Sequence, residues 1–275
     1  MNFGRTRRPL LVSILLFAVV VGVAGTTSAL RKPTPKQIPD LHDAREVHLA
    51  NVKQLTFGGE NAEAYFSRDG KKLIFQSQRD GYPCDQHFTM NIDGSGVQRV
   101  STGTGRTTCG WWYKNGKRVL FSSTHEADAQ CPPKPDFSKG YVWPVYPTYK
   151  IYSAKPDGTD LQVVFPKNLK QGEEPGYNAE SVVSPDGKKI VFCSDRAGDL
   201  DIWVMDIDGK NAHQLTKRLG YEGGPWWSPD GKHIAFRAYY PQTDKQKEDY
   251  TSLLKQHLIR PTTLDLYVMD ADGSN

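Results

Sequence analysis

A short turn motif that occurs four times constrains the fold of this chain more than any other feature. Each copy carries Asp-Gly or Asn-Gly followed by Lys, and each precedes an apolar run that ends in Phe. The glycines of successive copies are 46, 71 and 44 residues apart, so the basic repeat is close to 45 residues with one long insertion. A repeat of this length, built from short strands and tight turns, is typical of a four-stranded β-propeller blade. The copies lie at residues 67–71, 114–117, 184–188 and 228–232.

The runs beside these turns alternate as half-buried strands do. In residues 200–206, Leu200, Ile202 and Val204 point one way, and Trp203 with Met205 the other way. Asp-Gly allows the positive φ that a short hairpin requires. We therefore expect an all-β propeller with four recognisable four-stranded blades, whose strands are called A to D from the channel outward. The strands expected in the first blade are 62–67, 72–78, 87–92 and 97–101, and in the third 178–184, 189–194, 201–207 and 212–216.

The first 29 residues predict an export signal, either cleaved or retained as an N-terminal anchor. Three arginines precede an apolar run at 10–24, and small residues follow at 27–29. This run is short for a bilayer span. Residues 30–50 are expected to form a proline-rich tether, and residues 51–275 hold the repeats. The protein is thus predicted to be periplasmic or secreted, with membrane contact only through an uncleaved N-terminal segment.

Composition and motifs argue against several classes of function. The net charge of +4 is small, and the lysines are spread over the turns, which argues against a nucleic-acid partner. The pair His125-Glu126 lacks the second histidine of a zinc-protease motif, because position 129 is Ala. The serine-hydrolase motif Gly-x-Ser-x-Gly does not occur. We expect no catalytic residue, metal or cofactor.

Four cysteines suit an oxidising compartment. Cys84 and Cys109 are expected in adjacent loops on one face of the propeller, and we predict a disulfide between them. Cys131 lies in another loop on the same face and could compete for either partner. Cys193 lies in an apolar strand and is expected to be a buried free thiol.

Two long insertions, at 124–148 and 240–263, both separate strand B from strand C. Loops of this kind emerge on one face, and insertions gathered on one face of a repeat protein usually mark the binding face. The second insertion contains a helical pattern, with Asp244 as the expected N-cap. This helix is expected to pack onto the blades as a lid, with a partner-binding helix as the alternative. Its apolar stripe is formed by Tyr250, Leu253, Leu254, His257 and Leu258.

Candidate binding residues follow from equivalent positions in the repeats. Glu63 and Glu180 share a position near the start of strand A, where Cys109 and Gly224 stand in the other blades, so we expect them at the mouth of the central channel. Arg79 and Arg196 occupy matching sites just after strand B and could bind an anion or a carboxylate. The residues predicted for the binding face are Glu63, Arg79, His125, Trp143, Glu180, Arg196, Tyr250 and His257.

The sequence of the repeats resembles the TolB-type propeller repeat. The resemblance is carried by Ser-Asp-Arg-Ala-Gly-Asp-Leu-Asp-Ile-Trp-Val-Met-Asp-Ile-Asp-Gly at 194–209, by Gln-Leu-Thr at 54–56 and 214–216, and by Ser-Pro-Asp-Gly-Lys at 228–232. It implies an exported propeller that binds protein partners of the cell envelope rather than catalysing a reaction. From the resemblance we expect a short tether here in place of the amino-terminal domain that precedes the propeller in TolB.

The resemblance leaves the closure of the propeller open. TolB-type propellers have six blades, and this chain holds strands for four. Residues 52–56 are expected to be a lone strand D that could complete blade four and close a four-bladed ring. The chain stops within a turn after strand C, which favours the front part of a six-bladed propeller. Such an arc would expose strand edges and apolar faces at both ends.

Two classes of function remain. The first is an exported, non-enzymatic interaction scaffold of the cell envelope that binds through the face carrying the insertions. The alternative is the propeller part of a hydrolase, a peptidase or a carbohydrate-binding protein whose catalytic part is absent from this chain.

Overall fold

A computed structural model describes residue 43 and residues 45–275. The chain divides into two units, residues 1–53 and 54–275, and all the repeats lie in the second. The predicted export signal and most of the predicted tether lie outside the described residues. Among the described residues, no helix is long and apolar enough to span a membrane.

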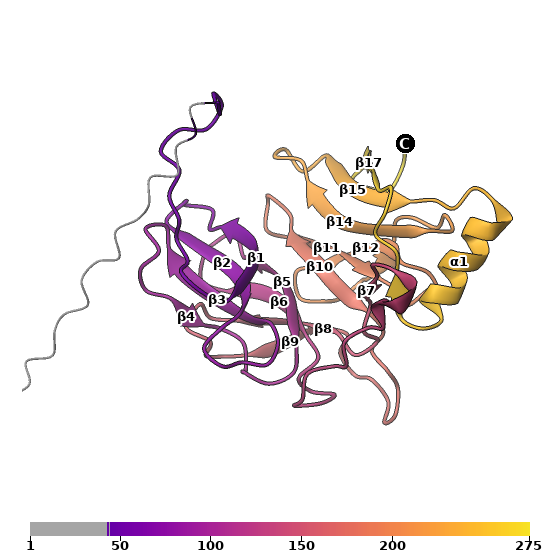
Figure 1. The fold of residues 1–275 in the computed structure, drawn as a ribbon, viewed down its shortest axis with the longest axis horizontal. Helices are drawn as coiled ribbons and strands as arrows, with labels where there is room; N and C mark the ends of the chain where they lie inside the picture. The colour runs from indigo at the N-terminus through magenta and orange to yellow at the C-terminus, as the bar shows by residue number, and fades with distance from the viewer. Residues whose placement is uncertain (1–42, 44) are drawn as a thin grey trace, which may run out of the picture. The chain divides into compact units, whose positions relative to one another are not determined.

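Four antiparallel sheets follow one another in chain order within residues 54–275 (Figure 1). The first contains β1 (Glu60–Phe66), β2 (Lys72–Gln78), β3 (Gln86–Asn91) and β4 (Gln98–Arg99). The second contains β5 (Thr107–Trp112), β6 (Val119–Ser123), β8 (Lys150–Ala154) and β9 (Gln162–Phe165). The third contains β10 (Asn178–Val183), β11 (Lys189–Ser194), β12 (Asp201–Asp206) and β13 (His213–Gln214). The fourth contains β14 (Tyr221–Trp227), β15 (His233–Tyr239) and β17 (Asp265–Asp270).

This arrangement confirms the predicted all-β propeller with four blades. The B strands of blades one and three have the predicted bounds, and the A and C strands agree within two residues. The D strands are shorter than expected, because β4 and β13 each pair with strand C through only two residues. Residues 54–56, expected to belong to a lone strand D, form no strand, and blade four has three strands in the described chain.

Apolar side chains from both faces of each sheet form the core between blades. One cluster joins Leu120 and Ile151 of blade two to Ile190 and Phe192 of blade three, and similar clusters join blade one to two and blade three to four. The prediction that strand C of blade three is buried on one face only is therefore wrong. Met205 is buried as fully as Ile202, because the neighbouring blades cover both faces of this sheet.

The turns between strands C and D hold neighbouring blades together. In blade three, Gly209 has φ +84° and lies against strand D of blade two, where an added Cβ would meet the carbonyl oxygen of Val164 at 2.0 Å. Only glycine allows this backbone geometry and this close approach together. The equivalent glycines of the other blades lie against the preceding strand D, or against Leu55 in the case of blade one; they are Gly94, Gly158 and Gly273.

In the first and last blades, β1 and β17 are much more exposed than the strands of the two blades between them. Leu266 and Val268 on β17 are 85% and 61% exposed, and nearly all of β1 is exposed, whereas β10 is buried along its whole length. The interior blades are covered on both sides, and these two are covered on one side. The sequence analysis expected such exposed edges for an open arc.

The two insertions contain small elements that pair with each other. The first holds η1 (Phe137–Lys139) and β7 (Trp143–Pro144), and the second holds α1 (Asp244–Leu254) and β16 (Leu258–Ile259). β7 and β16 form an antiparallel pair, extended by a hydrogen bond from Val145 N to His257 O of 2.8 Å. Both insertions therefore lie on one face, as predicted.

The N-cap of helix α1 lies one residue before the predicted cap. The N-cap is Thr243 rather than Asp244, because Thr243 forms a capping box in which Gln246 N donates to its hydroxyl and its own N–H donates to Gln246 Oε1. Tyr250 and Leu253 are buried, in agreement with the predicted stripe and with packing as a lid. The helical stripe ends with the helix at Leu254. His257 lies beyond the helix with a positive φ, and Leu258 belongs to β16.

The predicted disulfide between Cys84 and Cys109 is wrong. Cys84 is bonded to Cys131, with the two Cα atoms 6.0 Å apart, and Cys109 is a free thiol on strand A of blade two. The first insertion folds back toward blade one, which brings Cys131 rather than Cys109 to Cys84. Cys193 is a buried free thiol, as predicted.

Candidate functional site

A cavity of about 600 Å³ lies between the first insertion and the inner strands of the blades. Its floor comes from the A strands of blades one to three, and its roof from residues 134–146 of the insertion. Three features hold this roof in place: the Cys84–Cys131 disulfide, the β7–β16 pair, and a 2.8 Å hydrogen bond from Tyr146 OH to Pro133 O. The cavity is therefore pre-formed, as most small-molecule sites are.

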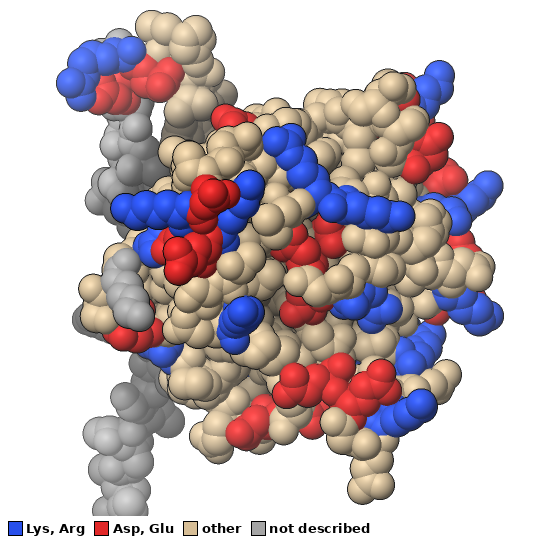
Figure 2. Space-filling model, turned by 90° about the vertical axis from the view of Figure 1, so that its right-hand side faces the viewer, with Lys and Arg blue, Asp and Glu red and all other residues tan. Residues whose placement is uncertain are grey.

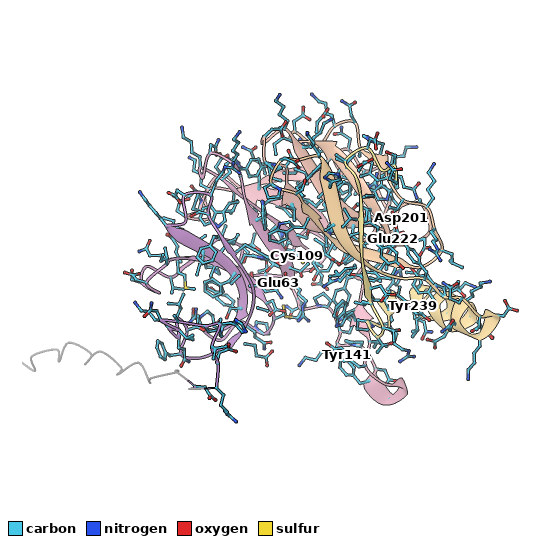
Figure 3. All side chains as sticks on the ribbon, turned by 90° about the horizontal axis from the view of Figure 1, so that it is seen from above. Glu63, Cys109, Tyr141, Asp201, Glu222 and Tyr239 are labelled. Atoms are coloured by element: carbon cyan, nitrogen blue, oxygen red, sulfur yellow. A yellow bond between two sulfur atoms is a disulfide. The ribbon has the colours of Figure 1, made fainter. Side chains whose placement is uncertain are left out.

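The A strands share a bulge that places one residue of each blade at the floor. Each strand shifts register in its middle, and the residue at the shift has φ between 52° and 58°. A positive φ costs free energy for any residue except glycine, and such strain gathers at functional sites. The four residues are Glu63, Cys109, Glu180 and Gly224, the set that the repeat alignment predicted at the channel mouth (Figure 3 labels the first two).

Glu180 is the centre of a hydrogen-bond network that links blades three and four. Arg237 Nη2 lies 3.1 Å from Glu180 Oε2, and Tyr177 OH donates to Oε1 at 3.0 Å. Tyr221 OH lies 3.3 Å from both carboxylate oxygens, and Gly224 N donates to Oε2. Nearly buried carboxylates need such partners to remain charged. Beside Glu180, the pKa of Arg237 is held above its usual value, although its burial acts in the opposite direction.

A second residue of each A strand closes the channel beneath the floor. The rings of Tyr65, Trp111 and Trp226 lie two residues after the bulge positions, and their centroids are 4.6 to 5.5 Å apart. On the far side of these rings, a separate cavity of about 260 Å³ opens between the A–B turns. The aromatic cluster thus separates the cavity on the insertion face from the opposite mouth.

The site offers no activated nucleophile among the described residues that form it. Burial, with Glu180 and Glu63 nearby, raises the pKa of the Cys109 thiol well above its usual value. The thiol therefore stays protonated, and a protonated thiol is a poor nucleophile. Within residue 43 and residues 45–275, no group of three His, Cys, Asp or Glu side chains is arranged to hold a metal ion.

The structure brings three of the predicted binding residues together in the cavity: Glu63, Trp143 and Glu180. Tyr250 does not reach the cavity, because it lies in the core beneath α1, where its hydroxyl donates to Asp199. His257 is exposed at the end of the second insertion, outside the cavity lining.

Arg79, His125 and Arg196 take part in repeat packing and do not line the cavity. Each stands four residues after the Phe that recurs in strand B of every blade, and each lies against an aromatic ring of strand C. The Arg79 guanidinium is 5.6 Å from the Phe88 ring, and the His125 ring is 4.5 Å from that of Tyr152. In blade four, Tyr240 stands at the equivalent position and meets the Tyr267 ring edge to face. Equivalent positions in the repeat explain this role better than ligand binding.

Several residues of the site were missed by the sequence analysis. Arg106 forms a 2.5 Å ion pair with Asp85, and both line the cavity beside Arg237. Tyr141 lies on the roof and accepts a 2.8 Å hydrogen bond from Trp143 Nε1 (Figure 3). The sequence could have pointed to Arg237, because it directly follows the Phe of strand B. The other blades have the uncharged residues Gln76, Ser122 and Cys193 at this position. A lone charge at a buried repeat position indicates a specific partner.

Charges of both signs are mixed on the surface near α1. The face shown in Figure 2 carries lysines and arginines interspersed with carboxylates, and no continuous basic stripe crosses it. Nucleic-acid binding needs a clustered basic surface. This face does not provide one.

Four antiparallel sheets of three or four strands around a channel place the described chain in the β-propeller class. A family model described as the TolB beta propeller domain matches residues 154–243, from the end of blade two into blade four. The matched residues are therefore similar to TolB-type propeller repeats, as the sequence resemblance indicated.

Similar proteins fit the same class. An uncharacterized protein of Agrobacterium fabrum is 27% identical over 187 residues, which cover 64% of this chain and 54% of that protein. The Tol-Pal system protein TolB of Geobacter metallireducens is 50% identical over 46 residues, 17% of this chain and 11% of that protein. An uncharacterized peptidase of Bacillus subtilis is 34% identical over 85 residues, 30% of this chain and 12% of that protein. The chain thus spans about half the length of the Agrobacterium relative, and less of the others.

A solved structure supports the fold. The structure titled as a putative TolB from Agrobacterium tumefaciens superposes with a TM-score of 0.57 over 78% of this chain and 62% of that chain. The sequence identity is 19%, so this likeness concerns the fold.

Proposed function

We propose that this protein is an exported, non-enzymatic interaction scaffold of the cell envelope that binds a protein partner through its insertion face. We define the insertion face as the side formed by the two long B–C loops. The observation that carries the proposal is the β7–β16 pair, through which insertions of two different blades form one continuous structure. Repeat proteins use such elaborated faces for binding. The Geobacter relative, named for the Tol-Pal system, supports an envelope partner.

The fixed structure of both insertions supports this function over a purely structural one. The disulfide joins the first insertion to blade one, and α1 buries Tyr250 and Leu253 over blade three. A rigid surface binds with less loss of conformational entropy than a flexible loop. The aromatic rings of Phe137 and Tyr141 nevertheless remain more than half exposed on it. Exposed aromatic residues on a rigid surface are typical of interface anchors.

The proposal is tested by blocking one face at a time. Glu248→Cys places a thiol on the exposed side of α1, and Lys117→Cys places one in a turn on the opposite face. Cys193 and Cys109 have raised pKa values, and Cys84 and Cys131 are bonded, so a maleimide polymer should label the new thiols selectively. Each labelled protein is then used to capture partners from envelope extracts.

The label on residue 248 should abolish capture of the partner, and the label on residue 117 should leave capture unchanged. Equal capture by both labelled proteins would contradict the assignment of the insertion face. Capture lost only with the label on residue 117 would place the partner on the A–B turn face.

The second candidate is the propeller part of a hydrolase, which the similarity to the Bacillus peptidase favours. In that case the cavity would select the substrate for a separate catalytic domain. A hydrolase domain with a Gly-x-Ser-x-Gly motif, encoded in the same reading frame beyond residue 275, would support this candidate over the scaffold.

A further inference from the structure

Several side chains that line the cavity beneath the first insertion keep polar atoms without a hydrogen-bond partner in the described part of the chain. They include donors on Arg237, Lys134 and Gln76 and acceptors on Glu63 and Asp85. These side chains line the same 600 Å³ space. A ligand would therefore meet both donors and acceptors.

The charges of the lining are balanced. Arg106, Lys134 and Arg237 oppose Glu63, Asp85 and Glu180, and two of these cations already form ion pairs inside the site. An anionic ligand could only accept hydrogen bonds, and an ammonium group could only donate them. Either would leave the free polar atoms of one kind without a partner, which costs free energy in a partly buried site. A hydroxyl group both donates and accepts, so a polyhydroxylated neutral ligand satisfies this set.

Aromatic rings supply the apolar part of the lining. Tyr141 is 62% exposed at the edge of the roof, and Trp143 and Tyr146 are half-buried beside it. Trp143 is fixed from two sides, by the hydrogen bond to Tyr141 and by the Arg237 guanidinium 4.9 Å from its ring centroid. The C–H groups on one face of a pyranose ring form an apolar surface that packs on such rings, while the hydroxyls at its edge reach polar groups.

We propose that this cavity binds a segment of a neutral oligosaccharide. The inference rests on the proposed function only in using the insertion face as the binding face, and it assigns that face a second ligand besides the protein partner. The sugar rings lie against Tyr141 and Trp143, and their hydroxyls bond to Arg237, Lys134, Glu63 and Asp85. The aromatic cluster of Tyr65, Trp111 and Trp226 closes the far end, so the ligand enters from the insertion face.

Calorimetric titration of the full chain with chitotetraose and maltotetraose tests this inference. We expect at least one of these neutral tetrasaccharides to bind at low and at high salt with equal affinity, because no charge is neutralised. Tyr141→Ala should weaken binding about tenfold or more. Phe66→Ala removes a ring that is similarly exposed at the opposite mouth, and it should leave binding unchanged. Unchanged circular dichroism of both variants establishes that they are folded.

Three results would overturn the inference. One is no binding of either tetrasaccharide at millimolar concentration, and another is binding that survives Tyr141→Ala. The third is displacement of the sugar by polyphosphate or by a neutral peptide that binds more tightly in the same cavity. Partner capture is measured in parallel with Tyr141→Ala. Capture without sugar binding would refute only this inference, and sugar binding without capture would refute only the protein scaffold.

Discussion

Arg237 Nη2 of blade four lies 3.1 Å from Oε2 of Glu180 of blade three, and the Glu180 side chain is only 9% exposed. Strand A of blade three and strand B of blade four are joined by this pair at the floor of the cavity. The same guanidinium holds Trp143 of the insertion from below. One side chain thus connects two blades with the roof of the site.

Replacement of Arg237 by Met should destabilise the fold by about 3 kcal/mol, because it leaves a nearly buried carboxylate without its cation. Arg260→Met is the matched control, since the Asp249 carboxylate that pairs with Arg260 at 3.1 Å is 51% exposed and stays hydrated when its cation is lost. The control should lose less than about 1 kcal/mol. Chemical denaturation of the two variants provides the comparison, and equal losses would show that the Glu180 pair adds nothing to stability.

The stability of the protein should fall as the pH rises from about 4 to about 7. Asp201 is 1% exposed and lies beside Glu222 (Figure 3). Its pKa is raised to about 7 by burial and by the carboxylates of Asp199 and Glu222. The folded state therefore keeps a proton that the unfolded state releases above its ordinary pKa of 3.8. The stabilisation is complete below that value and is lost as the pH passes about 7, with a total on the order of 4 kcal/mol.

Asp201→Asn should remove most of this dependence and raise Tm at neutral pH. Asp157→Asn is the control, because Asp157 lies in an exposed turn and its pKa is lowered by its hydrogen bonds to Thr159. That control should keep the loss between pH 4 and 7. Thermal unfolding measured between pH 4 and 7 tests this prediction. A Tm of the unaltered protein that does not change across this range would rule out a buried neutral Asp201.

Loss of the Cys84–Cys131 bond should cost about 2 to 4 kcal/mol, since the bond spans a sequence separation of 47 residues. Cys131→Ser measures this loss, and Cys109→Ser is the control with an intact disulfide. Peptide mapping without reductant should recover residues 84 and 131 in one linked fragment. A linked fragment containing residue 109 would restore the pairing that the sequence analysis favoured.

Gly209→Ala should be more destabilising than Gly198→Ala by at least about 1 kcal/mol. Both glycines have φ near +90°, so each alanine is strained. Only at position 209 does the new Cβ also meet a backbone oxygen, whereas nothing lies within 4 Å at position 198. Equal losses of unfolding free energy in urea denaturation would mean that the backbone at Val164 shifts to accommodate the added methyl group at little cost.

Local chemistry explains which parts of the fold could be predicted from the sequence. Asp-Gly turns and period-two strands recur in each blade, so strand bounds and the equivalence of Glu63 with Glu180 followed from the repeat alone. The partner of Cys84 and the β7–β16 pair depend on the path of two long loops, which no repeat encodes. Arg79 and Arg196 were misjudged because a charged residue after a strand was taken for a ligand-binding group. The aromatic rings that these arginines contact, Phe88 and Trp203, stand at equivalent positions of strand C. That equivalence in the sequence could have predicted the contact between guanidinium and ring.

Photo-crosslinking in cells tests the binding face most directly. A benzoylphenylalanine is placed at Phe137 on the insertion or at Phe66 at the opposite mouth, two positions that are both more than half exposed. If the insertion face binds the partner, irradiation should give a crosslinked envelope protein from position 137 and none from position 66. Crosslinks from position 66 alone, or equal crosslinks from both positions, would contradict the account.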